Sequence, residues 1–160
     1  MDDMDILRYM VTIEGIVEHN GWAVQGVFPA EGDSGCPFAY TVGLWQRFGH
    51  PELVMTGLDP RTCQALLNDI AGRVKDGARF SPGDRLDDVV QGHRDLVMPV
   101  TFVAMSETSR DENLGVACRY NGLGPFDALQ VLWPDTNGVL PGEPGFEERF
   151  VSLQPVWGRL

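Results

Sequence analysis

The residues with the clearest chemistry lie in one stretch, 38–54, where polar side chains interrupt apolar runs. Tyr40 and Thr41 carry hydroxyl groups that would point to opposite faces of an expected strand. His50 and Glu52 lie on either side of a proline, which restricts the backbone before it to an extended conformation. Residues two apart in a strand share one face, so this imidazole and this carboxylate would lie together. A pocket for a small molecule would most naturally include these four side chains.

A second pair of polar groups follows a later strand. Trp133 and Asp135 bracket a proline at the end of that strand, where side chains reach the rim of a sheet. An indole beside a carboxylate suits a flat, partly basic ligand. The structural alternative is an indole that covers the core and a carboxylate that begins a turn. The sequence thus offers six candidate ligand-binding residues: Tyr40, Thr41, His50, Glu52, Trp133 and Asp135.

Imidazole and carboxylate groups are also ligands for transition metals. A metal site would need His50 and Glu52 together with a distant partner, His93 or Asp135. The structural alternative is that His50 and Glu52 satisfy backbone groups at the start of a strand. We favour that alternative, so the sequence predicts no metal and leaves any other cofactor unknown.

Nucleophilic catalysis finds little support in the sequence. No Gly-x-Ser-x-Gly elbow is present, and Cys36 lies in an expected loop without an identifiable basic partner. Cys63 and Cys118 lie on faces of expected helices. The glycine-rich segments lack the lysine of a phosphate loop. Whether the protein is an enzyme is left open.

Hydrophobic periodicity predicts the elements that must position these residues. Apolar residues at helical spacing predict an opening helix that begins near Ile6 and stops at Asn20. The clearest helix is expected over 60–76, with Asp59 as its cap and a proline at its first position. Strands are expected over 22–28, 38–44 and 53–58.

In the second half of the chain, the polar stretch 81–95 predicts a surface loop or a lid that could close over a ligand. A strand is expected over 96–105, a helix over 110–120 and a strand over 128–133. The Gly- and Pro-rich segment 136–160 is expected to wrap the body of the protein. Its expected anchors are Phe146, Phe150, Leu153 and Trp157.

Strands and helices do not alternate strictly along the chain, which favours an α+β fold with a mainly antiparallel sheet over a doubly wound parallel one. The sheet could curl into a half-barrel and would be flanked by two or three helices. The chain has 160 residues, of which 43% are hydrophobic and 22% charged. This size and composition predict a single globular domain over 1–160.

The formal net charge of −11 disfavours binding to nucleic acid or to an anionic membrane surface. Three cysteines, an odd number without a Cys-x-x-Cys pair, indicate a reducing compartment. The N-terminus is acidic, unlike a signal peptide, and no apolar run is long enough to span a membrane. The sequence therefore predicts a cytoplasmic protein.

Five short segments carry a resemblance to a known family. They are Gly21-Trp22-Ala23-Val24, the stretch 38–44, His50-Pro51-Glu52-Leu53, the stretch 128–135 and Gln154-Pro155. Their order and approximate spacing, over nearly the whole chain, resemble the bacterial domain-of-unknown-function family 4262. The resemblance implies no activity, because none is established for that family. Asn20 separates His19 from Gly21, where the family tends to place a histidine directly before the Gly-Trp pair, so the resemblance assigns no role to His19.

Two functional hypotheses from different classes follow. In the first, the sheet edge forms a pocket, lined by the six candidate residues, that binds or modifies a small molecule. In the second, the protein is a non-catalytic acidic module whose tryptophan and phenylalanine side chains contact a protein partner. The many hydroxyl, imidazole and carboxylate groups near one expected sheet edge favour the pocket.

Overall fold

The computed structural model describes residues 2–30, 35–91 and 97–158. These residues form one open six-stranded sheet in the order β1-β2-β3-β6-β5-β4. Strands β3 and β6 run parallel, and the other neighbouring pairs are antiparallel. The strands are β1 (Ala23–Val27), β2 (Phe38–Val42), β3 (Glu52–Thr56), β4 (Arg85–Gln91), β5 (Val97–Ala104) and β6 (Ala128–Leu132). The predicted α+β fold with a mainly antiparallel sheet is confirmed, but the sheet does not close.

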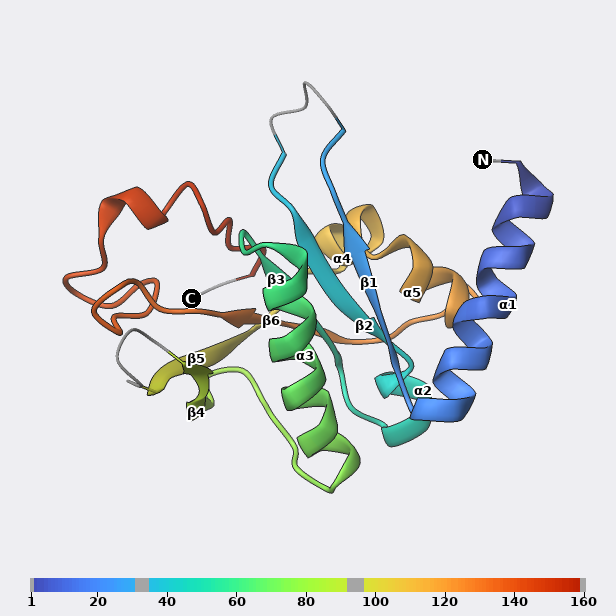
Figure 1. Ribbon diagram of the computed structural model, residues 1–160, viewed down its shortest axis with the longest axis horizontal. Helices are drawn as coiled ribbons and strands as arrows, with labels where there is room; N and C mark the ends of the chain where they lie inside the picture. The colour runs from blue at the N-terminus through green and yellow to red at the C-terminus, as the bar shows by residue number, and fades with distance from the viewer. Residues whose placement is uncertain (1, 31–34, 92–96, 159–160) are drawn as a thin grey trace.

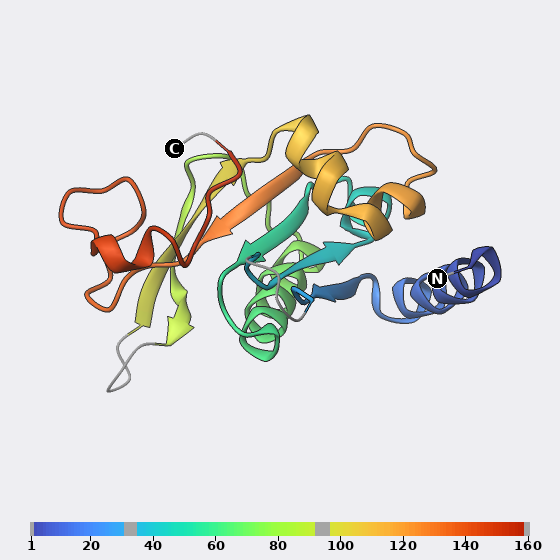
Figure 2. The same ribbon diagram turned by 90° about the horizontal axis from the view of Figure 1, so that it is seen from above.

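Helices cover both faces of the sheet (Figures 1 and 2). The described part of the chain holds five α-helices: α1 (Asp3–Asn20), α2 (Leu44–Phe48), α3 (Pro60–Lys75), α4 (Glu107–Asn113) and α5 (Gly115–Tyr120). Helix α3 packs on one face, and α1 and α5 pack on the other. Figure 2 shows α1 at one end of the molecule and the C-terminal segment at the other. Within these ranges, none of the helices combines the length and apolar character that a membrane span requires.

The two parallel strands in the middle of the sheet are buried on both faces. All five residues of β3 and all five of β6 are buried. Leu53 and Met55 pack with α3, whereas Val54 packs with α1 and α5, as the two-residue period of a strand requires. Any polar group in these strands therefore needs a hydrogen-bond partner inside the protein.

Helix α3 confirms the strongest sequence prediction. Asp59 caps its N-terminus by accepting a hydrogen bond from the Thr62 amide (3.2 Å), and Pro60 is its first residue. Its inward face buries Cys63, Leu67, Ile70, Ala71 and Val74. Burial of each larger aliphatic side chain stabilises the fold by about 2 kcal/mol.

The predicted loop over 81–95 is wrong in part, because Arg85–Gln91 forms the edge strand β4. An edge strand pairs on one side only and faces water on the other, so it tolerates the two aspartates in its centre. A register shift within the β4–β5 pair also disturbs its polar–apolar alternation. The last part of the predicted loop, 92–95, lies outside the described residues.

Two helical predictions also need correction. The helix expected over 110–120 is divided into α4 and α5 at Leu114, whose backbone leaves the helical region (φ −103°, ψ 52°) while its side chain is buried. The end of the strand expected over 38–44 instead turns into α2 at Gly43, where a positive φ of 114° favours glycine. A Cβ at Gly43 would lie 2.7 Å from a side-chain carbon of Val17 on α1, which leaves room for no residue larger than glycine.

Main-chain and side-chain amides fix the C-terminal segment to the middle of the sheet. The Gln130 side chain donates to the carbonyl of Pro155 (2.7 Å) and accepts from the amide of Trp157 (2.7 Å). At Gly57, which has a positive φ of 90°, the carbonyl oxygen of Leu153 occupies the space that a Cβ would need. The Leu153 side chain, expected to be an anchor, is 50% exposed. This residue therefore contributes its main chain to the contact.

Candidate functional site

Glu52, one of the six candidate residues, is buried at the N-terminus of helix α2. Its Oε1 accepts hydrogen bonds from the Thr41 hydroxyl (2.9 Å) and the Leu44 amide (3.1 Å). Its Oε2 accepts from the amides of Gly43 (3.0 Å) and Trp45 (3.3 Å). The first amides of a helix have no partner within the helix, so Glu52 replaces the capping side chain that glycine lacks. Burial raises the pKa of Glu52 to about 7, against the opposing effect of these hydrogen bonds.

Thr41 links this carboxylate to strand β3. Its hydroxyl oxygen accepts a hydrogen bond from the Leu53 amide (2.8 Å), while its proton is donated to Glu52. Both polar side chains are fully buried. Thr41 and Glu52 are therefore in contact, and their contact ties α2 to two strands without facing solvent.

His50 is also buried, and both of its ring nitrogens are occupied. Nε2 accepts a hydrogen bond from the Phe80 amide (3.0 Å), which leaves the proton on Nδ1 to be donated to the Pro51 carbonyl (2.8 Å). Burial lowers the pKa of His50, and the nearby charge of Arg79 lowers it further. The neutral imidazole of His50 thus hydrogen-bonds two backbone groups, which is the structural alternative considered for this residue.

Tyr40 is joined to a different helix. Its hydroxyl accepts a hydrogen bond from the Val116 amide (3.0 Å) in the first turn of α5, and its ring is 1% exposed. Burial raises the pKa of this hydroxyl above its ordinary value. Tyr40 and Thr41 thus hold helices α5 and α2 respectively, as expected of strand neighbours that point to opposite faces.

Trp133 lies just past the end of β6, and both its backbone and its indole ring form hydrogen bonds with other parts of the chain. Its indole N–H donates to the carbonyl of Thr56 (2.7 Å). The side-chain amide of Gln154 accepts from the Trp133 N–H and donates to its C=O, each at 2.9 Å. Gln154 therefore pairs with Trp133 much as a neighbouring strand would.

Asp135 organises the turn that follows. Its carboxylate accepts hydrogen bonds from the amides of Asn137 (2.9 Å), Val139 (2.9 Å) and Glu147 (3.0 Å). Burial alone would raise the pKa of Asp135, but these hydrogen bonds together lower it below its ordinary value. The carboxylate thus fixes the start of the C-terminal segment.

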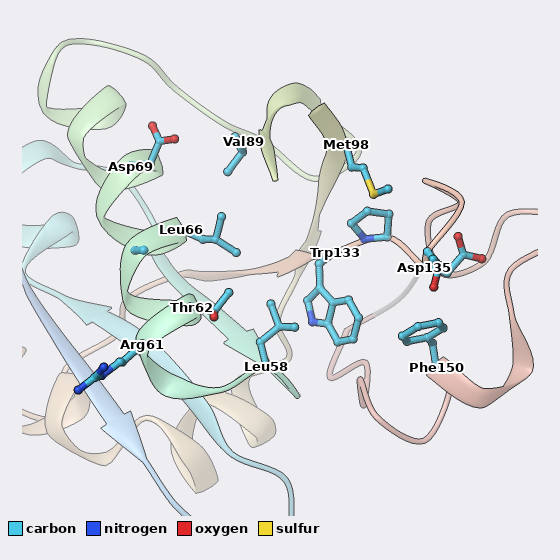
Figure 3. Close-up of a pocket in the computed structure, with 13 residues that line it drawn as sticks. Leu58, Arg61, Thr62, Leu66, Asp69, Val89, Met98, Trp133, Asp135 and Phe150 are labelled. Atoms are coloured by element: carbon cyan, nitrogen blue, oxygen red, sulfur yellow. The ribbon is translucent and has the colours of Figure 1, made fainter. Parts of the chain in front are cut away.

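A groove of about 710 Å³ lies between α3, the β4–β5 pair and the C-terminal segment (Figure 3). We call it the α3 groove. Its apolar lining includes Leu58, Leu66, Val89, Met98, Trp133, Pro134 and Phe150. Its polar lining is Arg61, Thr62, Asp69, Asp135 and Thr136. The volume lies within the range of small-molecule pockets.

Of these lining residues, the sequence predicted two, Trp133 and Asp135. The other four candidates do not line the α3 groove. Leu66 was missed because it lies at the edge of the inward stripe of α3, where it is only half-buried. Val89 and Met98 were missed because the first lay in a predicted loop and the pairing of β4 with β5 was not expected. Thr62, Leu66 and Asp69 do recur at helical spacing, which was the available signal.

A metal site stays a hypothesis with one member outside the described residues, His93. Among the residues that the structure does describe, no group of three or more His, Cys, Asp or Glu side chains is arranged to hold a metal ion. His50 and Glu52 already use their nitrogens and oxygens to bond Phe80, Thr41 and the amides of α2. A metal at these two residues would have to displace those hydrogen bonds.

Comparison with curated proteins and with solved structures finds no match. A family model described as Domain of unknown function (DUF4262) matches residues 16–147. The matched range contains the whole sheet and helices α2 to α5, whereas most of α1 precedes it and Phe150 of the α3 groove follows it. Because this match covers more than half of the chain, the protein belongs to the DUF4262 family of domains of unknown function.

Proposed function

We propose that the protein binds a small, mostly apolar molecule in the α3 groove. One observation carries the proposal: apolar side chains from α3, the β4–β5 pair, the end of β6 and the C-terminal segment converge on one space of about 710 Å³. A groove of this size can hold a ligand as large as a bicyclic aromatic compound against its apolar wall. Apolar contact would provide most of the binding free energy.

The two carboxylates and the indole N–H of the groove lining have partners within the chain, which supports binding rather than catalysis. The Asp69 carboxylate is 3.0 Å from Nε of Arg73, and the Asp135 carboxylate accepts three backbone amides. The Trp133 indole donates to a main-chain carbonyl. General acid–base catalysis needs a group that is free to exchange a proton with the substrate. Neither carboxylate is arranged for that role.

Two of the six sequence candidates, Trp133 and Asp135, belong to this proposal. Trp133 would contact the ligand, and Asp135 would hold the segment that forms one wall. The remaining four would act through the fold, by holding helices α2 and α5 and the Phe80 backbone: Tyr40, Thr41, His50 and Glu52.

The alternative function, an acidic interaction module, expects tryptophan and phenylalanine side chains to gather on the surface. No tryptophan in the described ranges is exposed. Phe28 is the only phenylalanine among the large apolar side chains that are exposed there. The α3 groove is therefore the better supported hypothesis.

Nile red, an uncharged dye whose emission shifts to the blue in apolar surroundings, tests the proposal. We expect saturable binding to the purified protein. Leu66→Asp should weaken binding by about tenfold or more, because it places a carboxylate in an apolar wall. The matched control is Leu7→Asp on α1, where the native side chain is 60% exposed and remote from the groove. No saturable binding, or an equal loss of affinity in both variants, would contradict the proposal.

A further inference from the structure

We infer that the ligand of the α3 groove carries a positive charge beside its apolar body, as an aromatic ammonium compound does. This inference rests on the proposed function, because it concerns the same groove. It follows from the charged groups beside the groove, where negative charge exceeds positive charge. An apolar wall and an excess of negative charge at its edge together define this class of ligand.

Two carboxylates share one guanidinium where α3 faces β4. Arg73 lies between two carboxylates, with Nε 3.0 Å from Asp69 and Nη1 2.7 Å from Asp88. One positive charge therefore faces two negative charges, and this end of the groove keeps a net negative charge. Asp69 lines the groove itself, and Figure 3 shows it on α3 beside Val89 of β4.

The other nearby cations do not offset this charge. Arg61 contributes to the lining, but its guanidinium points away from the groove in Figure 3. Arg149 is paired with Glu147 (2.8 Å) and stacks over the ring of Phe150, with its guanidinium carbon 4.8 Å from the ring centroid. Arg61 is thus directed away from the ligand space, and the charge of Arg149, which also donates to the lining Thr136 hydroxyl (3.1 Å), is offset by Glu147.

The net negative charge of the groove would then distinguish ligands that have the same apolar body but different charges. Beside an apolar wall, a charge acts through a lower effective dielectric than it does in bulk water. An ammonium group near Asp69 would be attracted, because Arg73 neutralises only one of the two carboxylates. A carboxylate on the same apolar body would be repelled by this end of the groove and by the net charge of −11. An uncharged analogue should bind with intermediate affinity.

Three compounds of similar size separate these cases: 1-naphthylmethylammonium, 1-naphthylmethanol and 1-naphthylacetate. Each would be titrated against the complex with Nile red, so that displacement reports binding at the same site. We expect the ammonium compound to displace the dye at a concentration about fivefold lower than the alcohol does. The carboxylate should be the weakest competitor.

Two isosteric variants locate the charge responsible. Asp69→Asn should reduce the advantage of the ammonium compound over the alcohol to about twofold or less. Asp5→Asn removes the same charge from α1, at the other end of the molecule, and should leave that advantage intact. An equal loss in both variants would assign the preference to net charge alone and overturn the inference. Dye binding with no preference for the ammonium compound would overturn it too, while leaving the proposed function standing. Failure of the dye itself to bind would remove the proposed function.

Discussion

The Thr41 hydroxyl and the Glu52 carboxylate form one hydrogen-bonded unit that joins three elements. Thr41 accepts from the Leu53 amide at 2.8 Å and donates to Glu52 at 2.9 Å. Glu52 in turn accepts the first amides of α2. A buried polar group that loses its partner costs about 1–3 kcal/mol, so each member of the unit depends on the others.

Thr41→Val should therefore be strongly destabilising. It leaves the Leu53 amide without an acceptor and removes one donor from Glu52, at a cost of about 3 kcal/mol. Thr41→Ser keeps the hydroxyl and loses one methyl group, at a cost of about 1 kcal/mol. Urea unfolding measures both free energies.

Thr12→Val is the matched control for the loss of a hydroxyl. The Thr12 hydroxyl is exposed, and among the residues that the structure describes it bonds only the Arg8 carbonyl of its own helix (3.1 Å). Its replacement should change the free energy of unfolding by no more than about 0.5 kcal/mol. Equal effects of Thr41→Val and Thr41→Ser would show that the hydroxyl at position 41 is not part of a stabilising unit.

Glu52 should make stability depend on pH. Burial raises its pKa from 4.5 in the unfolded chain to about 7 in the folded protein, so between these values the folded state holds a proton that the unfolded state has released. This contribution to stability is present in full below about pH 4.5 and is lost as the pH rises to about 7. The loss amounts to about 3 kcal/mol. The protonated carboxyl of Glu52 can donate a hydrogen bond to the Thr41 hydroxyl oxygen, whose second lone pair is free beside the one that accepts the Leu53 amide.

Comparison with Glu52→Gln isolates this effect, because the variant keeps every other titrating group. His50 is among these, and its lowered pKa acts in the opposite sense, with stability lost as the pH falls. The free energy of unfolding of the wild type minus that of the variant should decrease by about 3 kcal/mol between pH 4.5 and 7. A difference that stays constant over this range would exclude Glu52 as the source.

Tyr40→Phe tests whether a sequence candidate acts through the fold or through the ligand. The variant leaves the Val116 amide without its acceptor, which should cost about 1–2 kcal/mol of stability. Because Tyr40 does not line the α3 groove, the affinity for Nile red should stay within about twofold of the wild type. Weaker dye binding by an otherwise folded variant would point to a ligand site at Tyr40 instead.

The sequence predicted those elements that are marked by residues within the element itself or directly beside it. Helix α3 has a cap, a first-turn proline and a regular apolar stripe, and the structure contains it with nearly the predicted bounds. Helix α2 could not be predicted in the same way. It is only five residues long, and its cap is supplied by Glu52 from the next strand. Strand β4 was hidden because polar residues at a sheet edge resemble those of a loop.

The partners of the candidate residues depend on tertiary structure. Tyr40 bonds Val116, 76 positions away, and His50 bonds Phe80, 30 positions away. Residue type and spacing identified these groups as candidate ligand-binding residues, with a structural role as the alternative. They could not distinguish a group that faces a ligand from one that satisfies a backbone amide, because that distinction depends on which distant segment packs against it.

Gln154 connects the fold to the proposed site, so its removal should affect both. Gln154→Ala leaves the N–H and C=O of Trp133 without their partners, which should cost about 2 kcal/mol of stability. Because Trp133 forms part of the α3 groove, its freedom to move should also weaken Nile red binding by about threefold or more. Gln64→Ala, at an exposed position of α3 outside the groove lining, is the matched control and should change neither quantity. A loss of stability in Gln154→Ala with unchanged dye affinity would mean that the wall at Trp133 does not contribute to binding.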